Sequence, residues 1–397
     1  MKLGILREEK IPVDKRTPFS PSQCKRIIND FPNIEIYVQS SKFRCYSDKE
    51  YISNNISVSE DISFCDIFFG IKEVPSNNLI ANKTYFFFSH TIKKQDYNRD
   101  LLKNIISLNI EMIDYEVLKF KDGKRILGFG RYAGIIGAYN GLLAYGLKTN
   151  LFDLKPAHLC LNRKEMDCEL KKVVLKNENL LVTGKGRVGK GIIETLKKLN
   201  ITEVNIEDYL TKKFNYPVFL NIDVLDYNER LDEKKSSFLD FINNNAEYKS
   251  SFMKFVSKTN IYFAGHFYAS GAPYLFTRDD VRSKQFNISV VADISCDIDG
   301  PVATTIRASK ITDPIYGYNK ITESEDDFMK DGVIAVMAVD NLPCELPKDA
   351  SNDFGENLIK HVIPKLNSNN SILEDATICK DGDLTKNFEY LRDFINS

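Results

Sequence analysis

Short hydrophobic runs alternate with amphipathic stretches along most of this chain. Mostly apolar runs at positions 2–6, 34–38, 67–71 and 85–88 predict strands, and apolar residues at helical spacing in 21–30 predict a helix between the first two. Strands that are apolar along their whole length are typical of parallel sheets, which helices cover on both faces. The first third of the chain therefore predicts an α/β domain.

A second domain follows a change of pattern at residues 134–147, which form one small, apolar stretch of helical length. We expect this helix to join two domains, because small residues allow close packing. Apolar runs at 180–182, 204–206, 261–264, 289–292 and 333–339 predict the strands of another α/β domain, and residues 211–258 predict an irregular insertion that carries helices.

The predicted fold is therefore α/β with two Rossmann-like domains, parallel sheets and an active-site cleft between the domains. The expected substrate domain comprises residues 1–133 plus 325–397, because the final helices are expected to return to the first sheet. The expected dinucleotide-binding domain comprises residues 134–324.

The composition of the chain mainly excludes certain classes of binding partner. Lys and Arg number 54 against 55 Asp and Glu, so no charge excess indicates a nucleic acid or an anionic membrane. The chain opens without an apolar signal region, and no run approaches the roughly 20 apolar residues of a membrane span. The eight cysteines include no CxxC pair, which predicts free thiols. We expect a cytoplasmic protein that is a monomer or a small homo-oligomer.

A glycine-rich sequence after the run at 180–182 is the clearest functional signal. Its glycines allow a tight turn and close backbone approach, and the apolar residues that follow at helical spacing predict a helix whose N-terminal amides would face a pyrophosphate. A phosphate-binding loop of the GxxxxGK type is disfavoured, because Gly191 stands where a Ser or Thr would ligate magnesium. The expected cofactor-binding residues are Gly184, Gly186, Arg187, Val188 and Gly189.

Acidic residues after the run at 204–206 bear on the choice of cofactor. Asp208 lies 19 residues beyond Gly189, where an acid at a strand end can bind the ribose hydroxyls of NAD. Lys212 and Lys213 follow, and either could receive the extra phosphate of NADP. The sequence favours NAD and leaves NADP possible.

Three upstream positions have the chemistry of catalytic or binding groups. Arg16 lies in a charged turn before a helix and either grips a carboxylate or is a solvated loop cation. Lys72 and His90 each follow a predicted strand, the end of an α/β sheet where ligands bind. A desolvated lysine and an imidazole both exchange protons near neutral pH. The alternatives are a surface lysine and a structural histidine, and His266 is also expected to be structural.

These clusters, with several downstream segments, resemble the alanine dehydrogenase and transhydrogenase superfamily, and within it the saccharopine dehydrogenases (L-lysine-forming) and lysine-ketoglutarate reductases. Among them, 70–73 reads Gly-Ile-Lys-Glu and 293–300 reads Asp-Ile-Ser-Cys-Asp-Ile-Asp-Gly. The segments that carry the likeness are 6–8, 14–18, 70–73, 87–93, 128–134, 292–300 and 339–347.

The resemblance implies NAD(P)-dependent hydride transfer that interconverts saccharopine with L-lysine and 2-oxoglutarate, without a metal. It implies that Lys72 and His90 form an acid–base pair. The substrate-binding residues it implies are Arg16 and Lys93 for carboxylates, Glu73 and Glu116 for the ammonium of lysine, and Arg131 at the cleft. It also places Asp297 and Asp340 at the cofactor.

Two other functions remain open from the sequence. An alanine-dehydrogenase-like amino-acid dehydrogenase would share Arg16, Lys72 and His90 but would require free ammonia. A nicotinamide-binding sensor would keep the fold and lack turnover.

Overall fold

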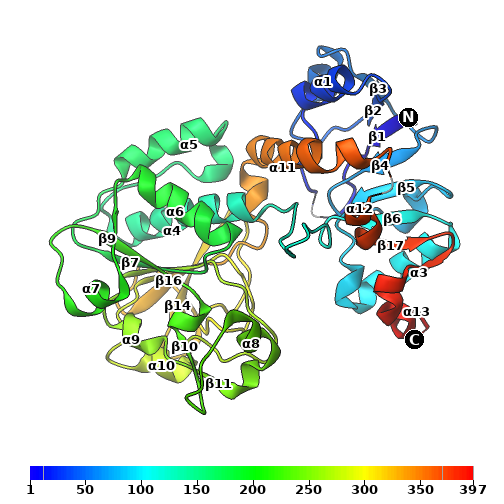
Figure 1. The fold of residues 1–397 in the computed structure, drawn as a ribbon. Coiled ribbons are helices and arrows are strands. Elements are labelled where there is room, and N and C mark those ends of the chain that lie inside the picture. The colour runs from blue at the N-terminus through cyan, green and yellow to red at the C-terminus, as the bar shows by residue number, and fades with distance from the viewer. Residues whose placement is uncertain (12, 369, 397) are drawn as a thin grey trace. The chain divides into compact units, whose positions relative to one another are not determined.

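Two α/β units, each built on its own eight-stranded sheet, make up the computed structural model, which describes residues 1–11, 13–368 and 370–396. Unit 1 comprises Met1–Phe129 and Pro347–Ser397, and unit 2 comprises Gly130–Leu346 (Figure 1). The second boundary differs from the expected 324/325 because residues 315–337 pair with the sheet of unit 2. Residues 377–384 join the sheet of unit 1. The substrate and dinucleotide roles of the two units, and the cleft between them, stay predictions.

The sheet of unit 1 has the strand order β18-β17-β6-β5-β4-β1-β2-β3. The pairs from β6 to β3 are parallel, and β17 runs antiparallel to β6. The strands are β1 (Lys2–Ile5), β2 (Glu35–Gln39), β3 (Ser57–Ser59), β4 (Ile67–Phe69), β5 (Thr84–Phe87), β6 (Glu111–Asp114), β17 (Thr377–Lys380) and β18 (Asp383–Leu384). The predicted runs at 2–6, 34–38, 67–71 and 85–88 thus correspond to β1, β2, β4 and β5.

Both faces of this sheet are apolar because successive side chains point to opposite sides. Phe69 and Phe86 stack at 4.6 Å in one core, whereas Phe68 and Tyr85 stack at 5.0 Å in the other. The helices of unit 1 are α1 (Pro21–Asp30), α2 (Asp48–Ile52), α3 (Arg99–Ser107), α11 (Pro347–His361), α12 (Ser371–Ala376) and α13 (Arg392–Asn396), with 3₁₀ turns η1 (Ser76–Asn78), η2 (Thr91–Lys93), η3 (Asp96–Asn98), η9 (Ile363–Lys365) and η10 (Lys386–Leu391).

The sheet of unit 2 has the order β15-β14-β16-β13-β12-β7-β9-β8. The pairs from β16 to β8 are parallel, and β14 is antiparallel to β16 and β15. Its strands are β7 (Asn179–Thr183), β8 (Thr202–Glu203), β9 (Val218–Ile222), β12 (Ile261–Ala264), β13 (Val290–Asp293), β14 (Ile315–Asn319), β15 (Ser324–Asp326) and β16 (Val333–Met337).

The helices of unit 2 include α4, the expected apolar helix, which begins four residues earlier than predicted. They are α4 (Gly130–Thr149), α5 (Arg163–Glu169), α6 (Arg187–Lys198), α7 (Ile206–Thr211), α8 (Phe238–Asn243), α9 (Met253–Val256) and α10 (Arg278–Arg282), with 3₁₀ turns η4 (Ala157–Leu159), η5 (Leu170–Lys172), η6 (Val224–Asp226), η7 (Asn245–Glu247) and η8 (Leu342–Glu345). None of the helices in the described part of the chain is long and apolar enough to cross a bilayer.

Helices α4 and α6 lie side by side on the sheet of unit 2 (Figure 1), and glycines allow their backbones to touch. A Cβ atom on Gly134 would overlap the carbonyl oxygen of Val188, and one on Gly191 would overlap that of Arg131. The small residues that predicted close packing are therefore needed where the two helices meet. Because α6 begins in the glycine-rich loop, this contact also fixes where that loop sits.

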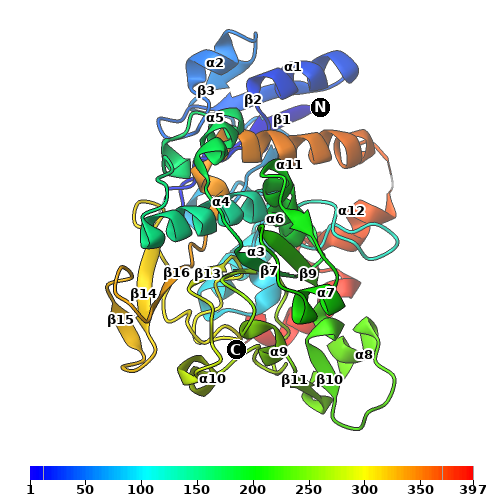
Figure 2. The ribbon, with the colours of Figure 1, turned by 90° about the vertical axis from the view of Figure 1, so that its left-hand side faces the viewer.

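Two sequence predictions in unit 2 are wrong. The run at 204–206 is not a strand: β8 ends at Glu203 and helix α7 begins at Ile206. The stretch 211–258 is not wholly an insertion, because it contains β9, the parallel neighbour of β7. Only the part after η6 is an addition to the sheet, formed by α8 and the hairpin of β10 (Asn228–Arg230) and β11 (Tyr248–Ser250), which lie together in Figure 2.

Candidate acid–base and dinucleotide sites

Lys72 lies just beyond β4, at the carboxyl end of the central strands of unit 1. Burial of its side chain lowers the pKa of the amine, and the positive charge of Arg16 lowers it further. Asp14 and Glu73 act in the opposite direction, and their smaller effect leaves the net shift downward. Lys72 is therefore a partly buried primary amine that loses its proton more easily than an ordinary surface lysine, and its catalytic role stays a prediction.

His90 lies just beyond β5 and is held against Glu73. Its backbone is left-handed, with φ 55°, and its Nδ1 lies 2.5 Å from Oε1 of Glu73. Lys10 Nζ lies 2.8 Å from the other oxygen of the same carboxylate. Burial alone would raise the pKa of Glu73, but the hydrogen bonds from His90 and Lys10 outweigh it and lower this pKa to about 2.

An ionised Glu73 determines which nitrogen of His90 carries the proton. The carboxylate accepts a hydrogen bond from Nδ1–H, so Nε2 is the nitrogen that remains for proton exchange. A non-glycine residue in the left-handed region is uncommon and often marks a functional site. Glu73 thus orients the imidazole of His90, and its charge also acts on the amine of its chain neighbour Lys72.

Arg16 is buried rather than solvated, which excludes the loop-cation alternative. Its Nε and a terminal nitrogen lie 3.0 Å and 2.5 Å from the two oxygens of Asp14. The guanidinium carbon lies 4.1 Å from the ring centre of Phe129. This arrangement orients the guanidinium firmly, and its predicted contact with a substrate carboxylate stays a prediction.

Glu116 and Lys93, both predicted to bind substrate, lie together in unit 1. Oε1 of Glu116 is 2.9 Å from Arg125 and 3.8 Å from Nζ of Lys93. Oε2 of Glu116 is buried and has no hydrogen-bond partner among the residues that the structure describes. A buried carboxylate oxygen without a donor is costly, so it suits an incoming ammonium group.

The glycine-rich loop between β7 and α6 fits a dinucleotide phosphate. Gly184 has φ +95°, and a Cβ atom on Gly189 would overlap the carbonyl oxygen of Gly184, so these positions require glycine. Gly186 is different, because nothing lies within 4 Å of where its Cβ would be. It is also the N-cap of α6 and makes no side-chain cap, which leaves the first-turn amides directed at this open space.

The acid beside this loop is Asp223 rather than Asp208. The prediction for Asp208 rested on a second strand that ends there, but β8 ends at Glu203 and lies at the sheet edge beside β9. Asp208 instead lies in the first turn of α7, 2.8 Å from Lys212. Asp223 directly follows β9, the strand that pairs with β7.

Contacts around β9 hold the strand end that precedes Asp223 against the glycine-rich loop. The side chain of Asn221 donates to the carbonyl oxygen of Gly184 at 3.0 Å, and Nζ of Lys185 lies 3.6 Å from Asp226. The backbone N–H of Asp223 donates to Asp226 at 2.7 Å. The sequence contained this signal, because an acid follows the short run 218–222, but Asn221 interrupts the apolar pattern.

The remaining predicted site residues lie in unit 2. Arg131, in the first turn of α4, makes two 2.9 Å contacts with Glu194 of α6, so it strengthens the contact between these helices. Asp297 and Asp340 follow β13 and β16, and burial raises the pKa of Asp297. His266 follows β12 and bonds Thr183 at 2.9 Å, while burial lowers its pKa to about 4, as suits a neutral structural histidine.

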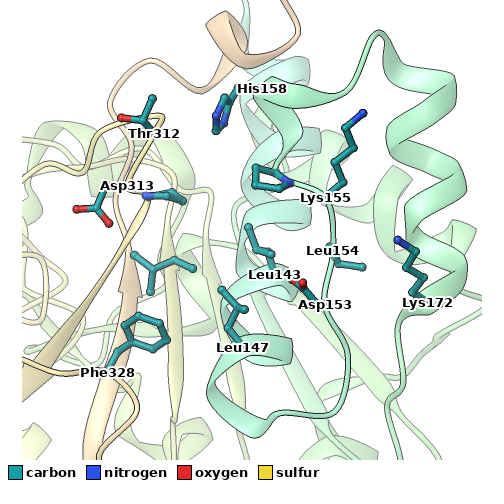
Figure 3. Close-up of a pocket in the computed structure, with 13 residues that line it drawn as sticks. Leu143, Leu147, Asp153, Leu154, Lys155, His158, Lys172, Thr312, Asp313 and Phe328 are labelled. Carbon is teal, nitrogen blue, oxygen red and sulfur yellow. The ribbon is translucent and has the colours of Figure 1, made fainter.

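A cavity of about 570 Å³ in unit 2 includes none of the predicted site residues. Figure 3 shows Leu143 and Leu147 of α4 on one side and Phe328 on the other. The cavity lies along α4 and β14 rather than at the glycine-rich loop. It is therefore a separate feature from the candidate dinucleotide site.

Two family models match the chain. One, described as the N-terminal domain of alanine dehydrogenase/PNT, matches residues 4–136, and the other, described as the C-terminal domain of alanine dehydrogenase/PNT, matches residues 170–387. The L-alanine dehydrogenase structure is similar over 99% of this chain and 100% of its own, with a TM-score of 0.66 and 15% identity. A transhydrogenase from Sinorhizobium meliloti has a TM-score of 0.55 at 12% identity, covering 97% of this chain and 99% of its own. These two likenesses concern the fold.

Curated relatives include alpha-aminoadipic semialdehyde synthases and saccharopine dehydrogenases. The synthase of Arabidopsis thaliana is 30% identical over 98% of this chain and 41% of its own length, and that of Mus musculus is 27% identical over 98% and 47%. The chain therefore spans less than half the length of these synthases. The saccharopine dehydrogenase [NAD(+), L-lysine-forming] of Yarrowia lipolytica is 23% identical over 90% of both chains.

Proposed function

The chain belongs to the alanine dehydrogenase/PNT family, and on that premise we propose that it is a lysine-forming saccharopine dehydrogenase, equally a lysine-2-oxoglutarate reductase in reverse. The observation that carries the proposal is the pairing of His90 with ionised Glu73 beside Lys72, whose amine has a lowered pKa. The names of relatives such as the Yarrowia lipolytica enzyme, which match along nearly the whole chain, support it.

The chemistry needs two proton-transfer groups of different kinds. Saccharopine must lose the proton of its secondary amine before the imine can form, and Lys72 in its neutral form is the base we assign to this step. A bound nicotinamide would supply the acceptor for the hydride of the substrate carbon next to that nitrogen. His90 takes a proton from the water that attacks the imine carbon. As the C–N bond of the resulting carbinolamine breaks, His90 returns that proton to the lysine nitrogen, and the hydroxyl proton leaves to solvent as the C=O bond of 2-oxoglutarate forms.

The charged residues of unit 1 suit the substrate as well as the reaction. Saccharopine carries three carboxylates and an ammonium, and Arg16 and Lys93 are the cations that we assign to carboxylates. We assign Glu116 to the ammonium, because its Oε2 is buried and has no donor within the described chain. Holding both ends of the substrate fixes the secondary amine with respect to Lys72 and His90.

We further propose that the cofactor is NAD. Asp223 follows the strand next to the glycine-rich loop, where a carboxylate binds ribose hydroxyls and repels the 2′-phosphate of NADP. Lys212, which had suggested NADP, is paired with Asp208 on α7. The open space at Gly186 and the uncapped start of α6 would hold the pyrophosphate.

Substitution of Lys72 and His90 tests the acid–base assignment. We expect Lys72→Met and His90→Gln each to lower kcat by about 100-fold or more, in the range of general acid–base catalysis, with NADH affinity unchanged. Lys94→Met is the matched control, because Lys94 follows η2 and its amine lies over the ring of Tyr390. Retention of full lysine-dependent turnover by the Lys72→Met, His90→Gln double variant would refute the assignment.

A further inference from the structure

Glu8 is a partly buried acid that the mechanism above does not use, yet its carboxyl group binds the backbone of Lys72. It follows β1, whose parallel neighbour β4 leads to Lys72 (Figure 1). Its Oε1 accepts the backbone N–H of Ile71 at 2.7 Å, and its Oε2 accepts that of Lys72 at 2.8 Å. One carboxyl group therefore binds two consecutive amides.

These two bonds continue the pairing of β1 with β4 beyond the end of the strands. The last backbone bond between the two segments runs from Leu6 N–H to the carbonyl oxygen of Phe69 at 2.9 Å. Beyond that point the Glu8 side chain takes the place of a backbone acceptor. The path of the chain into Lys72 is therefore set by a side chain of the neighbouring segment rather than by sheet pairing.

The surroundings of Glu8 make loss of its two amide hydrogen bonds unfavourable in free energy. Burial raises the pKa of Glu8 to about 8, and the charge of Asp14 adds to the rise, whereas the bonds from Lys72 and Ile71 and the charge of Arg16 oppose it. The Tyr115 hydroxyl, close enough for its own pKa to respond to Glu8, is buried and has no hydrogen-bond partner in the described chain. Removing Glu8 would leave two amides without acceptors in this setting.

We infer that Glu8 is a positioning residue, which holds the backbone of Lys72 so that its amine meets the reacting nitrogen. This inference rests on the proposed role of Lys72. Glu8 itself touches no reacting atom. It acts through two amide bonds, so its removal should displace the Lys72 amine and let water reach it. A displacement of about 1 Å at a reacting group costs roughly 100-fold in rate.

A double-mutant cycle separates positioning from general damage. We expect Glu8→Ala to lower kcat about 100-fold in the parent but to change it by less than about threefold in the Lys72→Met background, because the group it positions is then absent. Glu8→Gln keeps the volume but offers only one acceptor oxygen, and we expect a loss of about tenfold. NADH affinity, which belongs to unit 2, should stay unchanged, and an unchanged circular dichroism spectrum reports that unit 1 of each variant is folded.

Glu9→Ala is the matched control. Glu9 is the next residue on the same segment and bonds Arg7 and Asn78 instead of the Lys72 backbone. Its removal should leave kcat within about twofold of the parent, since surface pairs of this kind contribute little. Equal losses for Glu8→Ala and Glu9→Ala would overturn the inference, as would an undiminished effect of Glu8→Ala in the Lys72→Met background.

A second readout does not depend on turnover. Competitive acetylation of the folded protein between pH 6 and 11, read by peptide mass spectrometry, follows the Lys72 amine directly. We expect its titration in the parent and in Glu9→Ala to lie below the ordinary 10.5, and in Glu8→Ala and Glu8→Gln to move back toward it. The charges that face Lys72, those of Arg16, Asp14, Glu73 and Lys10, are kept in every variant.

The kcat measurements and the acetylation profile test the proposed function and the role of Glu8 independently. If the parent does not turn over lysine with 2-oxoglutarate, the proposed function is wrong, and the acetylation profile still decides the role of Glu8. If Lys72 in both Glu8 variants titrates as in the parent, Glu8 does not position Lys72, whatever the activity. If Glu8→Ala does not fold, the Glu8→Gln profile decides alone.

Discussion

Replacement of Glu345 by glutamine should stabilise the protein above neutral pH. Glu345 is the last residue of η8 and is 3% exposed. Oε1 accepts from the side chain of Asn140 at 2.8 Å, and the carboxyl group also accepts the backbone N–H of His158. Burial outweighs both bonds and raises the pKa of Glu345 from 4.5 to about 8.

The sign and size of the effect follow from this shift. The folded state binds the proton more tightly than the unfolded state, so the contribution of Glu345 is fully present below about pH 4.5 and is lost as the pH rises to about 8. At about 1.4 kcal/mol per pKa unit, the free energy of unfolding falls by roughly 4 kcal/mol between pH 5 and pH 8.5. A glutamine side chain at this position would keep the acceptor oxygen and carry no charge, so the variant escapes this loss.

Chemical denaturation of parent and Glu345→Gln at several pH values measures the effect. The two proteins differ at one residue, so the titration of all other groups cancels in the difference. We expect the free energy of unfolding of the variant, relative to that of the parent, to rise by roughly 4 kcal/mol between pH 5 and pH 8.5. In the control Glu325→Gln the difference should stay constant above pH 6, because Glu325 is paired with Arg307 and its pKa is lowered. A constant difference for Glu345→Gln as well would refute the burial argument.

Other substitutions separate packing from cofactor binding. Gly134→Ala should lower the free energy of unfolding by about 3 kcal/mol or more, because its Cβ overlaps the Val188 carbonyl oxygen, and an unchanged denaturation midpoint would contradict the α4–α6 packing. Gly186→Ala should leave stability unchanged, since its Cβ meets nothing within 4 Å, but should weaken NADH binding at least about tenfold in titration calorimetry. Asp223→Asn should weaken NADH binding by about 10- to 100-fold and strengthen NADPH binding, whereas an unchanged preference would exclude Asp223 as the ribose acid.

The sequence predicted strands from mostly apolar runs, and it missed strands such as β6 and β9, where polar residues shorten or interrupt the run. Strands β1, β4 and β5 could be predicted from their apolar runs. Both faces of the sheet are covered, so successive side chains in these strands are apolar. β9 was missed because Asn221, which bonds the Gly184 carbonyl, breaks its pattern. That omission placed the predicted ribose acid at Asp208 instead of the proposed Asp223, since an acid can be assigned only after its strand is known.

In the candidate site, too, the sequence predicted some features and missed others. The predicted strand ends indicated Lys72 and His90. The hydrogen bond between His90 and Glu73 depends on the left-handed backbone of His90, which no local sequence pattern predicted. Glu8 left no signal as a positioning residue, because it acts on backbone amides that lie more than sixty residues away in the chain. The position of a residue after a predicted strand was enough to suggest Lys72 and His90 as catalytic groups. The hydrogen bonds of Glu8 to backbone amides could be found only in the structure.

Oxidation of NADH by the purified protein with lysine plus 2-oxoglutarate, compared with ammonia plus pyruvate, tests the central claim most directly. The account predicts turnover that requires both lysine and 2-oxoglutarate, is faster with NADH than with NADPH, and is lost in Lys72→Met. Turnover only with ammonia and pyruvate would contradict it and favour an alanine-dehydrogenase-like enzyme. Binding of NADH without turnover of either pair would also contradict it and favour a nicotinamide-binding sensor.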